Sequence, residues 1–255
     1  GIIPLVLLAF MRRNLKESRR FEAATGGSSE PRAARPLFHV WRTPYRRRIW
    51  QLGLIWGLTY ACTNTLLAFW KDFAMKERAF TAGEVATSLT IAAIAAMPLV
   101  FLAGRIIDRL GRRRGAIVVY SACAAGGFFV YTLEGQAALT VALVFATFGI
   151  NAVLTVLNAY GSELFPTDIR ADAYAWSNNL LGRIGYVLGP AITGIAAESV
   201  GWGPAASATA LGPVLALVLI LILLPETGSK ELEDTAALAT KDDAKQGASL
   251  AGATS

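Results

Sequence analysis

Long runs of uncharged, mostly apolar residues alternate along the chain with short segments that carry the charges. The runs without Asp, Glu, Lys or Arg are residues 49–70, 85–104, 115–133, 135–162 and 199–225, and a sixth run, 174–197, contains only Arg183. A helix of about 20 apolar residues crosses the roughly 30 Å hydrocarbon core of a bilayer. The pattern therefore predicts an all-α, polytopic membrane protein with a six-helix transmembrane bundle over residues 49–225.

Composition supports this prediction. The chain has 255 residues, of which 54% are apolar and 16% are charged, and its mean hydropathy is +0.47. Soluble domains carry about 25% charged residues. These values exclude an ordinary soluble enzyme and a disordered chain. His39 is the only histidine and both cysteines, Cys62 and Cys123, fall within predicted spans, so no metal site and no cofactor are expected.

The basic residues predict how the chain is threaded through the membrane. Residues 12–48 hold eleven Lys or Arg, residues 105–114 hold five Arg and residues 226–255 hold three Lys, whereas the turns at Glu134 and Glu198 hold none. Basic connectors stay in the cytoplasm. We therefore expect a multi-pass protein of the inner or plasma membrane with a cytoplasmic C-terminus. The net charge of +6 does not indicate nucleic acid as a partner, because the arginines alternate by loop instead of forming one face.

The ends of the chain read differently from its centre. Residues 1–11 are apolar but too short to span, and we interpret them as the end of a truncated transmembrane helix. Residues 12–48 form a basic cytoplasmic loop with too little apolar content to fold alone. Residues 226–255 are predicted to be a largely disordered cytoplasmic tail.

The connector between the second and third spans has the pattern G-x-x-x-D-R-x-G-R-R over residues 104–113. It resembles the signature cytoplasmic loop of the major facilitator superfamily, the alternative being an ordinary arginine-rich loop. Two further segments resemble elements of the sugar porters and organic-ion transporters of that superfamily. These are E-x-x-x-x-x-x-R with an embedded F-P-T at 163–170, and L-P-E-T-G at 224–228.

The resemblance implies a fold and a gate. A weaker match at residues 15–21 resembles the segment after the sixth helix, so the chain would provide helices seven to twelve of a twelve-helix transporter, built as two inverted three-helix repeats. The missing N-terminal six-helix half is then an expected partner. The resemblance also implies a cytoplasmic gate network that closes the inner side in the outward-open state. Its members are Gly104, Asp108, Arg109, Gly111, Arg112, Glu163, Arg170 and Glu226.

Arg183 is the only charge deep within a predicted span. Such a residue costs a few kcal/mol on insertion scales and is a functional candidate by default. Its surroundings resemble the arginine-bearing eleventh helix of organic-ion transporters. Helical spacing places Trp176, Asn179 and Tyr186 on the same face, which we expect to line a central cavity. Two interpretations stay open: the guanidinium binds an anionic group of the solute, or it forms a structural pair with a carboxylate, for instance in the missing half.

Two other spans carry polar residues at helical spacing. The fourth has Asn151, Thr155 and Asn158 on one stripe, and the first has Tyr60 and Asn64 one turn apart. Polar side chains within lipid must face other helices or water. Hydrogen bonding between helices and lining of a substrate cavity are the alternatives for these residues.

These observations favour a secondary transporter that moves a small organic solute by alternating access. An anionic metabolite or a sugar is the expected solute, and a proton is a candidate co-substrate. The competing hypothesis is a non-transporting membrane scaffold or a truncated, inactive transporter fragment. An enzyme is not expected, because no pair of metal ligands and no Ser/His or Cys/His arrangement is found in the sequence.

Overall fold

The computed structural model describes residues 38–228. The predictions about residues 1–11, about most of the 12–48 loop and about the tail beyond residue 228 lie outside the described part. The chain divides into two units, Gly1–His39 and Val40–Ser255. All the packing discussed below lies within the second unit.

Helices account for nearly all of the described residues, which contain no β-strand. The elements are η1 (His39–Arg42), α3 (Arg46–Ala68), α4 (Trp70–Lys76), α5 (Ala82–Leu110), α6 (Arg112–Thr132), α7 (Gln136–Glu163), α8 (Arg170–Tyr174), η2 (Ala175–Gly182), α9 (Arg183–Val200), α10 (Trp202–Ala208) and α11 (Leu211–Leu223). Within residues 38–228, five helical segments are long and apolar enough to cross a membrane, and the pair α3–α4 makes a sixth if it is one span bent by 42°. The predicted all-helical membrane fold is confirmed.

The first span is longer than its uncharged run. The sequence predicts that it ends at Trp70, but α4 continues the helix to Lys76 beyond a bend at Phe69. This last part is amphipathic, with Phe73 buried and Lys76 exposed and paired with Asp72 at 3.2 Å. Absence of charge therefore locates the membrane-embedded part of a helix but not its end.

The last span is interrupted by a proline. Pro213 has no N–H to donate to the carbonyl of Thr209, and α10 ends at Ala208, just before Thr209. The Gly212 N–H instead donates to the Thr209 carbonyl at 2.9 Å, a tighter turn that leads into α11.

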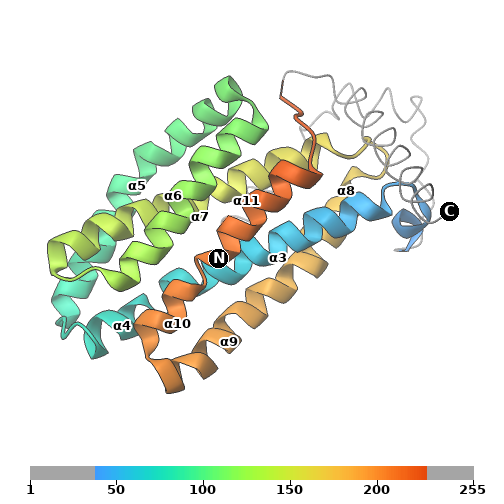
Figure 1. Cartoon of the computed structure of the whole chain (residues 1–255). Coiled ribbons are helices and arrows are strands. Elements are labelled where there is room, and N and C mark those ends of the chain that lie inside the picture. Colours follow the sequence, from blue (N-terminus) through green and yellow to red (C-terminus); the bar gives the residue numbers. More distant parts are fainter. Residues whose placement is uncertain (1–37, 229–255) are drawn as a thin grey trace, which may run out of the picture. The chain divides into compact units, whose positions relative to one another are not determined.

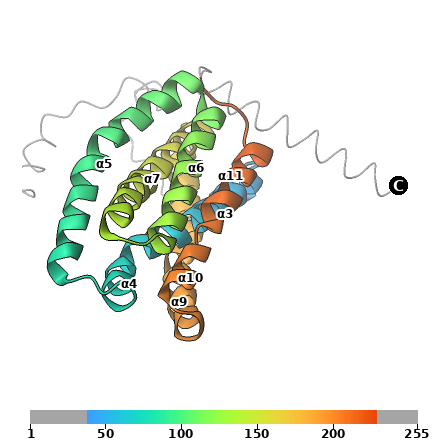
Figure 2. The same cartoon turned by 60° about the vertical axis from the view of Figure 1, so that its left-hand side comes forward.

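The helices pack in two groups (Figure 1). One group is α5, α6 and α7, and the other is α3 with η2, α9 and α11. Figure 2 shows α11 next to α6, which joins the groups. Glycine allows the closest approach, since a Cβ at Gly185 of α9 would lie 1.9 Å from the Gly57 carbonyl oxygen of α3.

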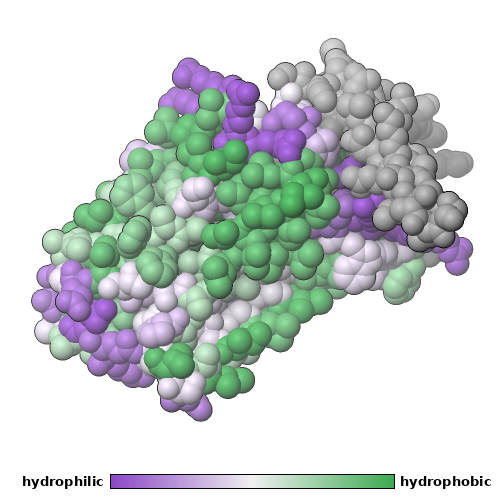
Figure 3. Space-filling view, viewed as in Figure 1, coloured by the Kyte–Doolittle hydropathy of each residue, from purple (hydrophilic) through white to green (hydrophobic). Residues whose placement is uncertain are grey.

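Large apolar side chains are exposed over the flank of the bundle. Phe101 is 78% exposed, Ile195 is 74% exposed and Ile222 is 68% exposed. In Figure 3 apolar residues cover the flank and hydrophilic residues gather at its ends. Exposed apolar surface of this extent requires a lipid or protein environment, as expected of a multi-pass membrane protein.

Candidate functional site

Arg183, the first residue of α9, lies against two tyrosine rings. Its Cζ is 5.3 Å from the ring centre of Tyr60 in α3 and 5.0 Å from that of Tyr186. The two rings meet edge to face, with their centres 5.7 Å apart. A cation within about 6 Å of a ring centre is attracted to the negative face of the ring. We call these three residues the Arg183 cage.

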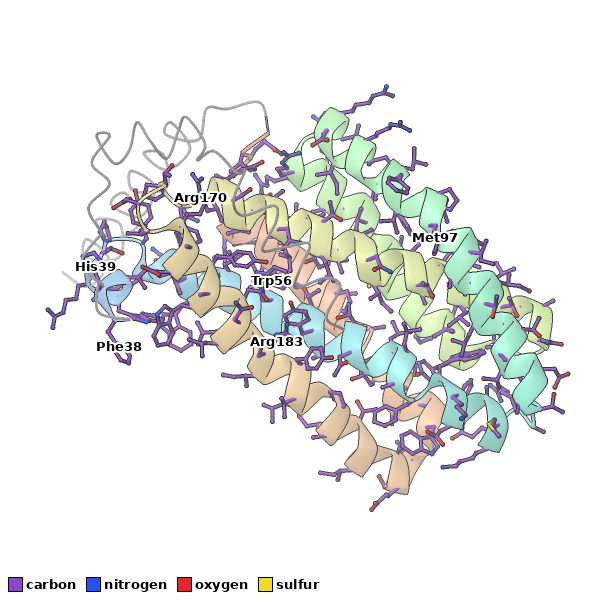
Figure 4. All side chains as sticks on the ribbon, turned by 180° about the vertical axis from the view of Figure 1, so that it is seen from behind. Phe38, His39, Trp56, Met97, Arg170 and Arg183 are labelled. Carbon is purple, nitrogen blue, oxygen red and sulfur yellow. The ribbon has the colours of Figure 1, made fainter. Side chains whose placement is uncertain are left out.

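The guanidinium of Arg183 is not neutralised within the described part of the chain. Arg183 is exposed, and none of its neighbours in residues 38–228 forms an ion pair with it. In Figure 4 Arg183 and Trp56 lie midway along the bundle, whereas Arg170 lies toward one end. The buried Trp56 ring stacks on Tyr60 with ring centres 5.0 Å apart, so the Tyr60 side of the cage packs against the core of the bundle.

A chain of hydrogen bonds leads away from the cage and joins three spans. The Tyr60 hydroxyl donates to Asn178 Oδ1 at 2.8 Å, and Asn178 Nδ2 donates to the Tyr174 hydroxyl at 2.7 Å. The Tyr174 hydroxyl donates in turn to Asn158 Oδ1 at 2.7 Å. Each hydroxyl or amide is used in a consistent direction, so the four groups polarise one another. We call this chain of four residues the Asn178 relay.

The relay depends on the unusual geometry of η2. This segment is a π-helix, whose hydrogen bonds join residues five apart and which occurs frequently at functional sites. The extra residue per turn brings Asn178, which is buried, toward Tyr60, and leaves Asn179 exposed. Asn179, Arg183 and Tyr186 are all exposed, and the lining of a central cavity by this face stays a prediction. The ring of Trp176 contacts Trp41, with centres 5.1 Å apart.

Asn178 and Tyr174 were not among the residues predicted from the sequence. The adjacent Asn178 and Asn179 were a signal for a polar site in this helix, but only the helical geometry decides which of them faces the bundle. A single π-helical turn shifts every later residue relative to the α-helical pattern.

The remaining predicted cavity residues make mostly local bonds. Asn64 Nδ2 donates to the Tyr186 carbonyl at 2.9 Å, which ties α3 to α9 next to the cage. Asn151 Nδ2 and Thr155 Oγ1 donate to carbonyls of their own helix, at 2.8 Å and 3.4 Å. Of the polar stripe on α7, Asn158 is the residue that the structure connects to the cage.

A second cluster lies where α5, α6, α7 and the end of α11 meet. Arg112 at the start of α6 donates to Asp108 Oδ1 at 2.7 Å and to Glu163 Oε1 at 2.7 Å. Its Nε also donates to Glu163 Oε1 at 3.0 Å, so the guanidinium engages this carboxylate through two nitrogens. The Thr227 hydroxyl donates to the other oxygen of Glu163. Asp108 is exposed, whereas the other two ionised side chains are largely shielded.

Glu226 accepts hydrogen bonds from the start of α6. Its carboxylate receives the backbone N–H groups of Arg112 at 2.7 Å and Arg113 at 2.9 Å. A carboxylate is stabilised at this positive end of a helix. Partial burial acts to raise the pKa of Glu226, but the N–H donors of Arg113, Gly228 and Arg112 outweigh it and lower the pKa.

The turn before α6 requires glycine. Gly111 has φ of +84°, and a Cβ there would lie 3.1 Å from the Glu226 carboxylate. The motif at residues 104–113 therefore supplies both Arg112 and the glycine turn that lets the first N–H groups of α6 bind the Glu226 carboxylate.

Two arginines stabilise the C-terminal end of α11, which also lies at this cluster. Arg48 and Arg113 donate to the Leu223 and Leu221 carbonyls, at the C-terminal end of α11. Cations are favourable at that end of a helix. Arg48 and Arg113 were not predicted for the gate, because a contact with a backbone carbonyl of α11 carries no sequence signal.

Three predicted gate residues, Arg170, Arg109 and Gly104, have surroundings different from those of Arg112. Arg170 Nε donates to the Phe165 carbonyl at 3.1 Å, within its own connector. Arg109 is exposed, and a Cβ at Gly104 would meet no atom within 4 Å. The gate role of the whole network stays a prediction. Among the described residues no group of three His, Cys, Asp or Glu could hold a metal ion.

Comparison with known proteins identifies the family. A family model described as Major Facilitator Superfamily matches residues 1–186. The chain belongs to the Major Facilitator Superfamily. Membership in this family of transporters, together with its candidate spans, makes it a multi-pass membrane protein of transporter type and not an enzyme.

Two relatives carry transporter names. The chain is 28% identical over 239 residues to "Probable 4-methylmuconolactone transporter" of Cupriavidus pinatubonensis, covering 92% of this chain and 54% of that protein. It is 28% identical over 258 residues to "Gallate transporter" of Pseudomonas putida, covering 87% of this chain and 55% of that protein. The chain therefore spans about half the length of the curated relatives it matches.

A solved structure confirms the superfamily fold. The inward-open xylose transporter of E. coli superposes with a TM-score of 0.60 at 16% identity, over 81% of this chain and 56% of that one. At this identity the likeness shows the fold alone.

Proposed function

We propose that the chain forms the C-terminal half of a secondary transporter that carries a small organic solute with an anionic group. The Arg183 cage is the observation that carries this proposal. An arginine in the middle of a span is costly unless it serves a pathway, and this one has an exposed guanidinium held by two rings. Its planar group can bind a carboxylate through two parallel hydrogen bonds.

The surrounding aromatic residues suit an organic anion. Tyr186, which is 38% exposed, provides an apolar face for the body of the solute, while Arg183 binds its charge. Tyr60 lies beside them, and the buried Trp56 packs behind it. The relatives named for 4-methylmuconolactone and gallate support a small organic solute. The Asn178 relay holds Tyr60 in place from the opposite side.

The cluster of Asp108, Arg112, Glu163 and Glu226 is proposed to act as a cytoplasmic latch. Ion pairs that are partly exposed are individually weak, so they can break and re-form as two near-equal states exchange. In this proposal the C-terminus is cytoplasmic, and inverted repeats rock around a site near the middle of the membrane.

The test is an uptake assay in cells that express the chain together with an upstream six-helix half. A panel of anionic, neutral and cationic solutes is supplied with and without a proton gradient, which also tests proton coupling. We expect uptake of an anionic solute that Arg183→Ala abolishes, while Arg105→Ala, an exposed arginine of the connector, leaves it unchanged. Uptake that is equal in Arg183→Ala would remove Arg183 from the site. Absence of uptake of every solute would favour the scaffold or inactive fragment.

A further inference from the structure

A basic hollow opens at the start of α3. It has a volume of about 400 Å³ and is lined by Trp41, Arg42, Thr43, Pro44, Arg46 and Arg47. Arg42 and Arg46 are exposed. The sequence contains no Asp or Glu between residues 31 and 71, so this stretch of the chain carries only positive charge. A hollow of this kind attracts a phosphate or another compact anion.

An apolar groove follows directly on α3. It has a volume of about 490 Å³, and its lining includes Gly53, Leu54, Gly57 and Ala61 of α3 with Ile184 and Leu188 of α9. The lining on α3 extends from Trp50 to Ala61, which is roughly 16 Å of helix. Glycines stand where the two helices contact, and apart from Gln51 and Trp50 at one end the lining is made of glycine, alanine, leucine and isoleucine. Its lining does not include Tyr60, Arg183 or Tyr186, so it is separate from the Arg183 cage.

A pair of tryptophans joins the hollow to the groove. Trp41 lines the hollow, Trp50 lines the groove, and their rings meet edge to face with centres 5.7 Å apart. Trp50 is 58% exposed although it is a large aromatic residue. Exposed tryptophan at the end of a span is typical of the headgroup level of a bilayer. The basic hollow is therefore at headgroup depth and the groove at acyl-chain depth.

From this juxtaposition we propose that α3 and α9 form a specific binding site for an anionic phospholipid. The phosphate binds Arg42 and Arg46, and one acyl chain lies in the groove between Leu54 and Leu188. The hollow fits the charge and the groove fits the apolar chain, and only an amphipathic anion satisfies both. A bound lipid would also brace α3 against α9, the two helices that carry the cage.

The experiment measures lipid binding to the purified chain in detergent by native mass spectrometry. Phosphatidylglycerol and phosphatidylcholine with the same acyl chains are compared, and glycerol phosphate and inorganic phosphate are added as competitors. Basic residues near an anionic surface contribute about 1 kcal/mol each. We therefore expect Arg42→Gln/Arg46→Gln to weaken phosphatidylglycerol binding about thirtyfold.

Two controls separate this site from general attraction. Arg105→Gln/Arg114→Gln removes the same charge from exposed arginines of another connector and should leave binding unchanged. Leu54→Trp fills the groove without altering charge and should weaken binding severalfold. Equal affinity for the two lipids, equal loss in the Arg105/Arg114 control, or displacement of the lipid by inorganic phosphate alone at equal concentration would overturn the proposal.

Discussion

Replacing Asn178 by leucine tests the register of the π-helical segment and the relay that depends on it. Asn178 is 6% exposed and Tyr60 is 9% exposed, so the hydrogen bond between them, at 2.8 Å, is shielded from water. Leucine has a similar size but cannot accept from the Tyr60 hydroxyl or donate to the Tyr174 hydroxyl. Leaving a buried hydroxyl without its partner costs about 1–3 kcal/mol.

The magnitude is expected near the lower half of that range. Hydrogen bonds between membrane helices average about 0.6 kcal/mol and reach about 1.7 kcal/mol. Asn178→Leu removes one such bond, to Tyr60, and one within its own span, to Tyr174. We therefore expect the free energy of unfolding to fall by about 1–2 kcal/mol. The change is measured by denaturant unfolding of the purified chain in detergent micelles.

The adjacent residue provides the matched control. Asn179 is exposed in η2, so Asn179→Leu should change the free energy of unfolding by less than about 0.5 kcal/mol. A larger loss for Asn179→Leu than for Asn178→Leu would refute the relay, because the exposed amide would then contribute more to stability than the buried one.

Three further variants test the cluster around Arg112 and the close helix contact. Asp108→Asn should slow solute turnover without reducing the amount of protein in the membrane, as measured by uptake rate and by immunoblot; normal turnover would contradict the latch. The pKa of Glu226 is lowered, so the stability that its carboxylate gives the start of α6 is present at neutral pH and lost as the pH falls below the ordinary glutamate value. Glu226→Gln should flatten this acid dependence of the thermal unfolding midpoint, and an unchanged pH profile would contradict it. Gly185→Leu should abolish folding, because its Cβ would lie 1.9 Å from a backbone oxygen. Gly194→Leu is the control and should be tolerated, because a Cβ there meets no atom within 4 Å. Equal yields of monodisperse protein for the two variants would contradict the close helix contact.

Much of the fold could be predicted from the sequence because lipid imposes a simple rule. A membrane span contains few charges, so five uncharged runs and one with the single charge of Arg183 indicated the spans. The motif at 104–113 led to the family. The charged end of the first span, residues 71–76, escaped this rule because an amphipathic helix leaves the membrane with its charged side chains exposed. The rule also does not predict breaks within a span. Pro213 explains the break between α10 and α11.

The sites were harder to predict than the spans. Arg183 stood out because a single charge in a long apolar run is unusual, and the structure adds its two tyrosine neighbours. Asn178 could not be chosen over Asn179, because the choice depends on the number of residues per turn in η2. The carboxylate of Glu226 binds backbone N–H groups, and such partners have no counterpart in a residue pattern.

The membrane threading is the claim on which the transport proposal depends, and thiol labelling measures it directly. Cys62 and Cys123 are first replaced by alanine, and Arg109→Cys or Glu134→Cys is then added as a single reactive site in whole cells and in inside-out vesicles. The threading predicts that a membrane-impermeant maleimide labels the cysteine at position 109 only in the vesicles and the cysteine at position 134 only in whole cells. Labelling at position 109 from the outside of intact cells would contradict it.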